Sequence, residues 1–307
     1  MTISMSPLKP MLYSKSFHLI IKVLNKLVFA LPILLLMSCV QSRSDDTARS
    51  GKMNLALDRQ LLTVAKSQVT MFHGYYPDAH ISLLPVSSDT TLRLLLDHHA
   101  RAALIEGRAD AHEDSSQKNP LRRELVARDA IVCIVNSRNP LKSISLKDLC
   151  NLYTRKNKAG MIPLVTANDF HLQSLFSAIT DSQQGDLKAW ACQSDSALLR
   201  RLSVDKRAVG LLFNSSPELK MVMAKSKKNI RMLPLSKDAR GPLSLLPTQQ
   251  NIFDGSYPLV TTVYYVYYSG DPLAAGFGSW LSGAGQKAFE RSTLAPCKLV
   301  ERTLILN

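Results

Sequence analysis

The residue types that enzymes use are present in this sequence, but their spacing forms no catalytic motif. It contains no HExxH metal motif, no Walker glycine loop, no GxSxG nucleophile elbow and no DxDxDG calcium loop. The pair His98-His99 falls at the end of an expected helix among basic residues, where histidines are usually solvated rather than metal-bound. We therefore expect no enzyme activity, no metal site and no cofactor, although an enzyme with a dispersed site stays an alternative.

The clearest chemical role belongs to Cys39. A lysine-bearing segment over 1–26 precedes an apolar run over 27–37, and the run ends in Leu-Met-Ser-Cys. A basic segment, a short apolar run and a small residue at the cut are typical of a secretory signal. A Cys at that point predicts a bacterial lipoprotein, in which the Cys becomes the acylated N-terminus. The alternatives are a plain signal peptide with an incidental Cys, or an uncleaved anchor helix.

This reading divides the N-terminal part of the chain in two. Residues 1–38 form the expected signal peptide, and residues 39–51 are a polar, patternless tether that begins at the lipidated Cys39. We therefore place the folded part in the bacterial cell envelope, periplasmic and held to a membrane by lipid. The sequence does not select the inner or the outer membrane.

Composition indicates an ordinary globular protein with a basic surface. The 307 residues are 46% hydrophobic and 20% charged, which excludes disorder over most of the chain. The net charge of +14 favours phosphate-type ligands, nucleic acid or anionic lipid. The basic residues are scattered pairs without interleaved aromatics, so we expect no nucleic-acid partner. Cys133 reads as a buried strand residue, and the sequence fixes no disulfide among Cys133, Cys150, Cys192 and Cys297.

From residue 52 onward, short apolar strands alternate with amphipathic helices, which predicts an α/β fold. Expected strands lie at 53–57, 80–84, 101–105, 130–135, 164–166, 208–213, 230–235 and 260–268. Expected helices lie at 59–75, 90–99, from 145, at 169–179, 194–202, 273–281 and 286–291. Asp58, Asp89 and Asp169 fall at helix starts, where they are read first as caps and otherwise as hydrogen-bond acceptors for a ligand.

Two long compound motifs resemble the phosphate-binding proteins of ABC transporters, the PstS-like family. The segment 126–140, VARDAIVCIVNSRNP, is similar to the family's ARDGIxxIVNxxNP, and 251–259, NIFDGSYPL, is similar to its xVxDGSYPL stretch. Weaker similarities at 144–153, 205–211 and 283–287 follow in the family's order. The chain is identified on these motifs as a divergent member.

The resemblance implies a two-lobed type II periplasmic binding-protein fold. Each lobe would be a mixed sheet flanked by helices, with the ligand in a cleft between the lobes. The first lobe would comprise residues 52–127 and 232–307, and the second residues 128–231. The resemblance also implies phosphate or a similar inorganic anion as ligand, an ABC permease as partner and a monomeric receptor.

Carrying the family's ligand positions over gives six candidate ligand-binding residues. They are Arg59, Ser88, Thr90, Arg108, Thr166 and Asn168. The glycines of the family's two phosphate-binding loops are absent, since Ser-Ser-Asp-Thr stands at 87–90 and Thr-Ala-Asn-Asp at 166–169. Glycine lets backbone N–H groups approach an anion closely. The function expected is therefore capture of phosphate or a similar oxyanion for an ABC importer. The alternative is an envelope lipoprotein that keeps the fold, has altered or lost ligand binding, and acts through a protein partner.

Overall fold

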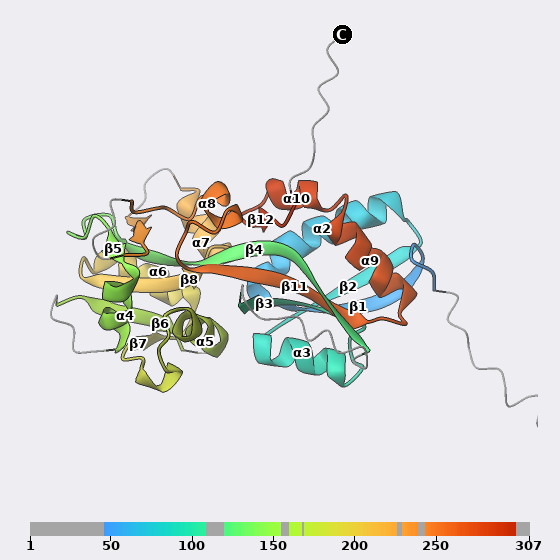
Figure 1. Ribbon diagram of the computed structural model, residues 1–307, viewed down its shortest axis with the longest axis horizontal. Helices are drawn as coiled ribbons and strands as arrows, with labels where there is room; N and C mark the ends of the chain where they lie inside the picture. The colour runs from blue at the N-terminus through green and yellow to red at the C-terminus, as the bar shows by residue number, and fades with distance from the viewer. Residues whose placement is uncertain are drawn as a thin grey trace, which may run out of the picture. The chain divides into compact units, whose positions relative to one another are not determined.

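A computed structural model describes residues 46–108, 120–154, 160–167, 169–225, 229–238 and 243–298. Within these ranges the chain is α/β, as predicted (Figure 1). The expected signal peptide over 1–38, Cys39 and most of the tether lie outside the described residues. No helix of the described part is long and apolar enough to cross a membrane.

The first lobe is built on parallel strands β1, β2 and β3, with β11 antiparallel to β3. These strands are β1 (Gly51–Asp58), β2 (Ala79–Val86), β3 (Ala102–Arg108) and β11 (Val260–Tyr268). The helices of this lobe are η1 (Arg59–Leu61), α2 (Leu62–Tyr75), α3 (Ser88–Leu96), α9 (Pro272–Ser282) and α10 (Gln286–Glu290). The chain passes from β1 to β2 and from β2 to β3 through helices, so the carboxyl ends of β1, β2 and β3 lie at one edge of the sheet.

The long strand β4 (Leu121–Asn136) joins the lobes. Its first part pairs with β11, and its last part, from Ile131 to Val135, pairs with β8 of the second lobe. The strand begins much earlier than the hydrophobic run at 130–135 suggested. Its first part carries charged residues. The guanidinium carbon of Arg123 lies 3.7 Å from the centre of the Tyr264 ring, so the arginine side chain covers this aromatic residue of β11.

The second lobe continues the same sheet, so that the path of pairing runs β2-β1-β3-β11-β4-β8-β6-β7. Its strands are β6 (Ile162–Thr166), β7 (Trp190–Cys192), β8 (Ala208–Phe213) and β9 (Ile230–Met232), with a small pair β5 (Ile144–Ser145) and β10 (Leu235–Ser236). Its helices are α4 (Leu146–Thr154), α5 (Phe170–Ile179), η2 (Gln184–Asp186), α6 (Asp195–Val204), α7 (Pro217–Met223) and α8 (Gln249–Phe253). The short β12 (Ala295–Pro296) pairs with β4.

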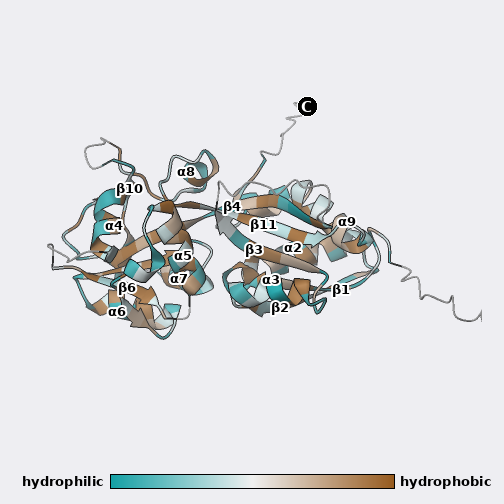
Figure 2. Ribbon diagram, turned by 60° about the horizontal axis from the view of Figure 1, so that its bottom comes forward, coloured by the Kyte–Doolittle hydropathy of each residue, from teal (hydrophilic) through white to brown (hydrophobic). Residues whose placement is uncertain are grey.

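Each lobe has its own hydrophobic core, and Figure 2 shows hydrophobic residues along the central strands. The core of the second lobe includes Leu233, Ile252 and Leu259, which lie beyond the boundary expected at residue 231. The lobe boundaries stay a prediction, and this packing favours placing the segment up to Leu259 with the second lobe. Cys133 is fully buried in β4, as predicted, and all four cysteines of the described part are free.

Most expected elements are confirmed, and the misses are short. Propensity and periodicity did not predict β7, α7 and α8, because each has three to seven residues and too few to show a period. His98 and His99 are exposed, as expected.

Candidate functional site

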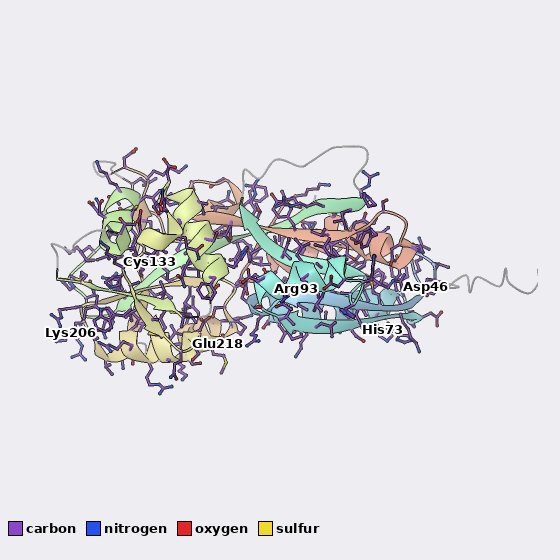
Figure 3. All side chains as sticks on the ribbon, turned by 90° about the horizontal axis from the view of Figure 1, so that it is seen from below. Asp46, His73, Arg93, Cys133, Lys206 and Glu218 are labelled. Carbon is purple, nitrogen blue, oxygen red and sulfur yellow. The ribbon has the colours of Figure 1, made fainter. Side chains whose placement is uncertain are left out.

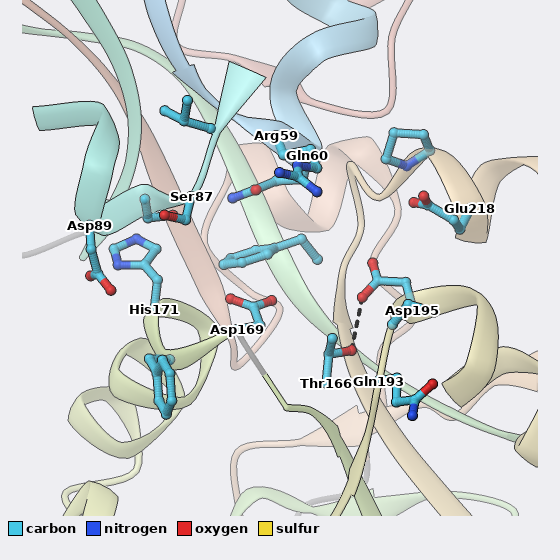
Figure 4. Close-up of a pocket in the computed structure, with 16 residues that line it drawn as sticks. Arg59, Gln60, Ser87, Asp89, Thr166, Asp169, His171, Gln193, Asp195 and Glu218 are labelled. Carbon is cyan, nitrogen blue, oxygen red and sulfur yellow. Dashed lines mark hydrogen bonds between the residues drawn. The ribbon is translucent and has the colours of Figure 1, made fainter. Parts of the chain in front are cut away.

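A pocket of about 420 Å³ lies between the lobes, at the ends of the sheet strands that lead into helices. The N-terminal ends of η1 and α3 reach it from the first lobe, and those of α5, α6 and α7 reach it from the second (Figure 4). A helix N-terminus presents N–H groups without intrahelical partners and the positive end of the helix dipole. The fold therefore directs five such ends at one cavity.

The first wall of the pocket comes from the segments that follow β1 and β2. Arg59 and Gln60 begin η1, and Ser87, Ser88 and Asp89 begin α3. Ser87 occupies the N-cap position of α3 but makes no capping bond, because its Oγ instead pairs with Thr90 Oγ1 at 3.0 Å. The Nε2 atom of Gln60 is buried and has no hydrogen-bond partner among the described residues. This wall offers a guanidinium, an unpaired amide donor, hydroxyls and one exposed carboxylate.

The second wall is acidic. Asp169 is the N-cap of α5 and accepts a hydrogen bond from the Leu172 N–H at 3.0 Å. Asp195, at the start of α6, accepts from Thr166 Oγ1 and from Ser216 Oγ, each at 2.8 Å. Glu218 stands in the first turn of α7, and Figure 3 shows it on the side of the second lobe that faces the first.

Burial perturbs two of these acids. It raises the pKa of Asp169 to about 6 and raises that of Asp195 from its ordinary value. Within the described ranges, no lysine or arginine forms an ion pair with Asp169, Asp195 or Glu218. The second wall therefore presents three acids without a lysine or arginine partner in the described part of the chain, with His171 close to Asp169.

Three more carboxyl groups are buried behind the first wall. The Glu106 N–H donates to Asp58 Oδ2 at 2.9 Å, Thr261 Oγ1 donates to Glu106 Oε2 at 3.1 Å, and the Ser215 N–H donates to Asp129 Oδ2 at 3.3 Å. The second oxygen of each carboxyl has no hydrogen-bond partner in the described part of the chain. Burial, reinforced by the neighbouring Asp129 and Asp58, raises the pKa of Glu106 well above its ordinary value.

The same physical cause acts on the two neighbours of Glu106. Burial raises the pKa of Asp129 to about 6 and raises that of Asp58. Burial therefore favours the protonated forms of these three carboxyls, and that of Glu106 most strongly.

One side chain connects the lobes across the pocket. His171, in α5 of the second lobe, places its Nε2 3.1 Å from the backbone oxygen of Glu106, at the end of β3 in the first lobe. The imidazole also lines the pocket. Movement of one lobe against the other must break or reform this contact.

The structure brings three of the six predicted binding residues to the pocket: Arg59, Ser88 and Thr166. Thr90 does not line it, because its hydroxyl turns back to Ser87 and to the Arg93 guanidinium. The backbone of Arg108 ends β3, but its side chain and the whole of Asn168 lie outside the described residues. That these six residues bind a ligand stays a prediction.

The capping interpretation of the three aspartates is confirmed for Asp169 alone. Asp58 stands in the N-cap position of η1 without a capping bond, because its carboxylate accepts from Glu106 instead. Asp89 lies inside α3, where Ser87 holds the N-cap position. Sequence reasoning missed Gln60, His171 and Glu218 as pocket residues; each lies within two residues of a helix start that follows a strand.

No group of three or more His, Cys, Asp or Glu in the described part could hold a metal ion. The buried acids Asp58, Glu106 and Asp129 are therefore not arranged as a metal centre.

The chain belongs to the PBP superfamily, since the model of the PBP superfamily domain matches residues 44–284. Solved structures share the fold. A protein described as a phosphate ABC transporter substrate-binding protein from Clostridium perfringens, solved with bound phosphate, matches with a TM-score of 0.63 at 15% identity, and the match covers 81% of this chain and 100% of that protein. An ABC-type phosphate transport receptor from Vibrio cholerae has a TM-score of 0.60 at 16% identity, covering 79% and 99%.

The fold alone does not set the function. A protein described as a LysR family transcriptional regulator from Pseudomonas aeruginosa also matches, with a TM-score of 0.51 at 12% identity, covering 84% of this chain and 79% of its own. No curated protein sequence matches this chain. The fold is the type II periplasmic binding-protein fold that the motifs predicted. With 15% identity to a solved structure of this fold, the chain is a divergent member of the superfamily.

Proposed function

We propose that the protein is a solute receptor of the cell envelope that captures a phosphate-type oxyanion between its lobes and delivers it to an ABC importer. The observation that carries this proposal is the first wall of the pocket, where Arg59 and the N-terminal ends of η1 and α3 meet. The solved structures from Clostridium perfringens and Vibrio cholerae, which are named for phosphate transport, support the same ligand class.

The first wall supplies what an oxyanion needs. The Arg59 guanidinium provides positive charge and paired donors. The free N–H groups of the first turns and the unpartnered Gln60 amide provide further donors directed at the cavity. Asp58 is fully buried behind this wall and does not line the pocket, so the ligand contacts are assigned to Arg59, Gln60 and the first turn of α3.

The receptor proposed here acts outside the cytoplasm. Its lipid anchor is Cys39, its tether is residues 39–51, and a monomer is sufficient because both walls of the pocket come from one chain. Several acyl chains would hold it stably, since each buried methylene contributes about 0.8 kcal/mol. We propose no enzymatic step.

A second candidate function is favoured by the second wall. The acids at the starts of α5, α6 and α7 occupy the positions at which an anion would meet those helix dipoles. On this reading the fold is retained, oxyanion binding is altered or lost, and the lipoprotein acts through a protein partner.

Calorimetric titration of phosphate and of sulfate into the full chain, in mild detergent, separates the two candidates. The receptor proposal predicts phosphate binding at micromolar or tighter affinity, weakened by about 30-fold in Arg59→Ala. The matched control is Arg138→Ala, an exposed arginine beyond the end of β4, away from the end of the β4–β8 pairing at which the pocket residue Phe213 lies. Absence of heat with both anions would refute oxyanion capture and leave the second candidate.

A further inference from the structure

We infer that the solute carries an ammonium group beside its oxyanion, so that the pocket binds a small aminoalkyl phosphate or phosphonate in preference to free phosphate. The inference rests on the proposed function, because it assigns the oxyanion to the first wall and the ammonium group to the second. The observation behind it is that Arg59 and the unpartnered Gln60 amide lie on one side of the cavity, whereas the acids at the starts of α5, α6 and α7 line the other.

The second wall is suited to a cation. Asp169, Asp195 and Glu218 line one side of the pocket, and no lysine or arginine of the described part forms an ion pair with them, while His171 lies close to Asp169. Asp195 is held in place by two hydroxyl donors and Asp169 by a backbone N–H. Unpaired carboxylates that become desolvated when lobes close are costly unless a positive charge enters with the ligand.

The Gln60 side chain provides independent evidence that the pocket binds a ligand. Its amide nitrogen is buried and unpartnered, although its side chain lines the cavity and lies beside Arg59 in Figure 4. Leaving a buried donor without an acceptor is unfavourable, and a ligand oxygen would satisfy it. The donor stands on the Arg59 side, so the ligand oxygen belongs there.

The volume of the pocket agrees with an organic ligand. About 420 Å³ falls within the range of roughly 300–1,000 Å³ that is usual for small-molecule sites. A tetrahedral ion held by Arg59 and Gln60 leaves the rest of that space, including the acidic wall, empty. In the complex we infer, a short alkyl chain carries the ammonium group from the oxyanion toward the acidic wall.

The test compares three phosphate compounds on the full chain in mild detergent by calorimetry, O-phosphoethanolamine, propyl phosphate and inorganic phosphate, with ethanolamine as a fourth ligand. Propyl phosphate has nearly the same shape as O-phosphoethanolamine but carries a methyl group where the other has ammonium. We expect O-phosphoethanolamine to bind at least about tenfold more tightly than either of the other phosphate compounds. In Glu218→Gln and Asp169→Asn, that advantage falls by about threefold or more while propyl phosphate binds as before or better.

The matched control for these variants is Asp186→Asn, which removes the same charge from an exposed acid on η2 outside the pocket and leaves the advantage intact. Equal binding of all three phosphate compounds would overturn the ammonium assignment and leave the oxyanion receptor standing. If ethanolamine alone binds as tightly as O-phosphoethanolamine, or if none of the three phosphate compounds binds, the oxyanion assignment itself fails.

Discussion

The two walls of the pocket are formed by the same kind of structural element, but the side chains that they present differ in charge. Each wall consists of helix N-termini that follow strands of one continuous sheet. In the first lobe these ends carry Arg59, the unpaired Gln60 amide and serine hydroxyls, with Asp89 exposed among them. In the second lobe every one of the three ends carries an acid. A helix N-terminus is therefore an anion site only where the chain leaves it uncovered.

The largest expected effect concerns the acids behind the first wall, and it is a change in stability with pH. Because the native pKa of Asp129 is raised to about 6, the folded chain binds more protons than the unfolded chain above about pH 4. Each such group lowers the free energy of unfolding by about 1.4 kcal/mol per pH unit between its unfolded and folded pKa values. Urea unfolding at about pH 4.5, 6 and 7.5 should show stability falling as pH rises.

Glu106→Gln sharpens this prediction, because the amide keeps the shape of the side chain and removes the titrating group. The variant should lose part of the decline above about pH 6 and be more stable than the parent at about pH 7.5. A parent whose stability is constant over this range would contradict the assignment of protons to the cluster.

Replacing an acid of the second wall by a cation should reduce the difference in charge between the two walls and strengthen phosphate binding. In Glu218→Lys, a cation replaces an acid at the start of α7, and we expect phosphate to bind about tenfold more tightly. Calorimetry measures the change, and Asp186→Lys on η2 is the control for the gain in net charge. An unchanged phosphate affinity would mean that Glu218 does not sense the bound anion.

Protonating Asp169 in the second wall should also strengthen anion binding, but by a smaller factor. The pKa of Asp169 is about 6, so lowering the pH from about 7.5 to 5 neutralises a carboxylate that repels an anion. We expect sulfate, which does not titrate in this range, to bind roughly three- to fivefold more tightly at the lower pH. In Asp169→Asn the pH dependence should largely vanish; if it persists in full, another group is responsible.

The smallest effect distinguishes two neighbouring residues of α3. Ser88 lines the pocket, whereas the Thr90 hydroxyl is engaged with Ser87. We expect Ser88→Ala to weaken phosphate binding about threefold and Thr90→Val to change it by less than about twofold. The reverse order would place Thr90 at the ligand, as the sequence had suggested.

The fold could be read from the sequence in large part, because its signals are local or are carried by long motifs. The alternation of strands and helices and the segments 126–140 and 251–259 predicted the architecture, which the family match and the solved structures confirm. The charged first part of β4 was missed because its stability comes from pairing with β11, a partner more than 120 residues away.

The site could be read only in part. Arg59, Ser88 and Thr166 were found because they stand at positions of the family's ligand loops. Glu218 and His171 were missed, since their place at the pocket depends on how α7 and α5 pack against the other lobe rather than on any motif. The acidic wall is a property of three segments together, so no single segment of sequence shows it.

The most direct test is a crystal structure of the protein with O-phosphoethanolamine bound. We expect the ligand in the pocket between the lobes, with its phosphate oxygens within hydrogen-bond distance of Arg59 and Gln60 and its nitrogen beside Asp169 or Glu218. A phosphate placed against the second wall, or a ligand bound outside this pocket, would contradict the opposed chemistry of the two walls.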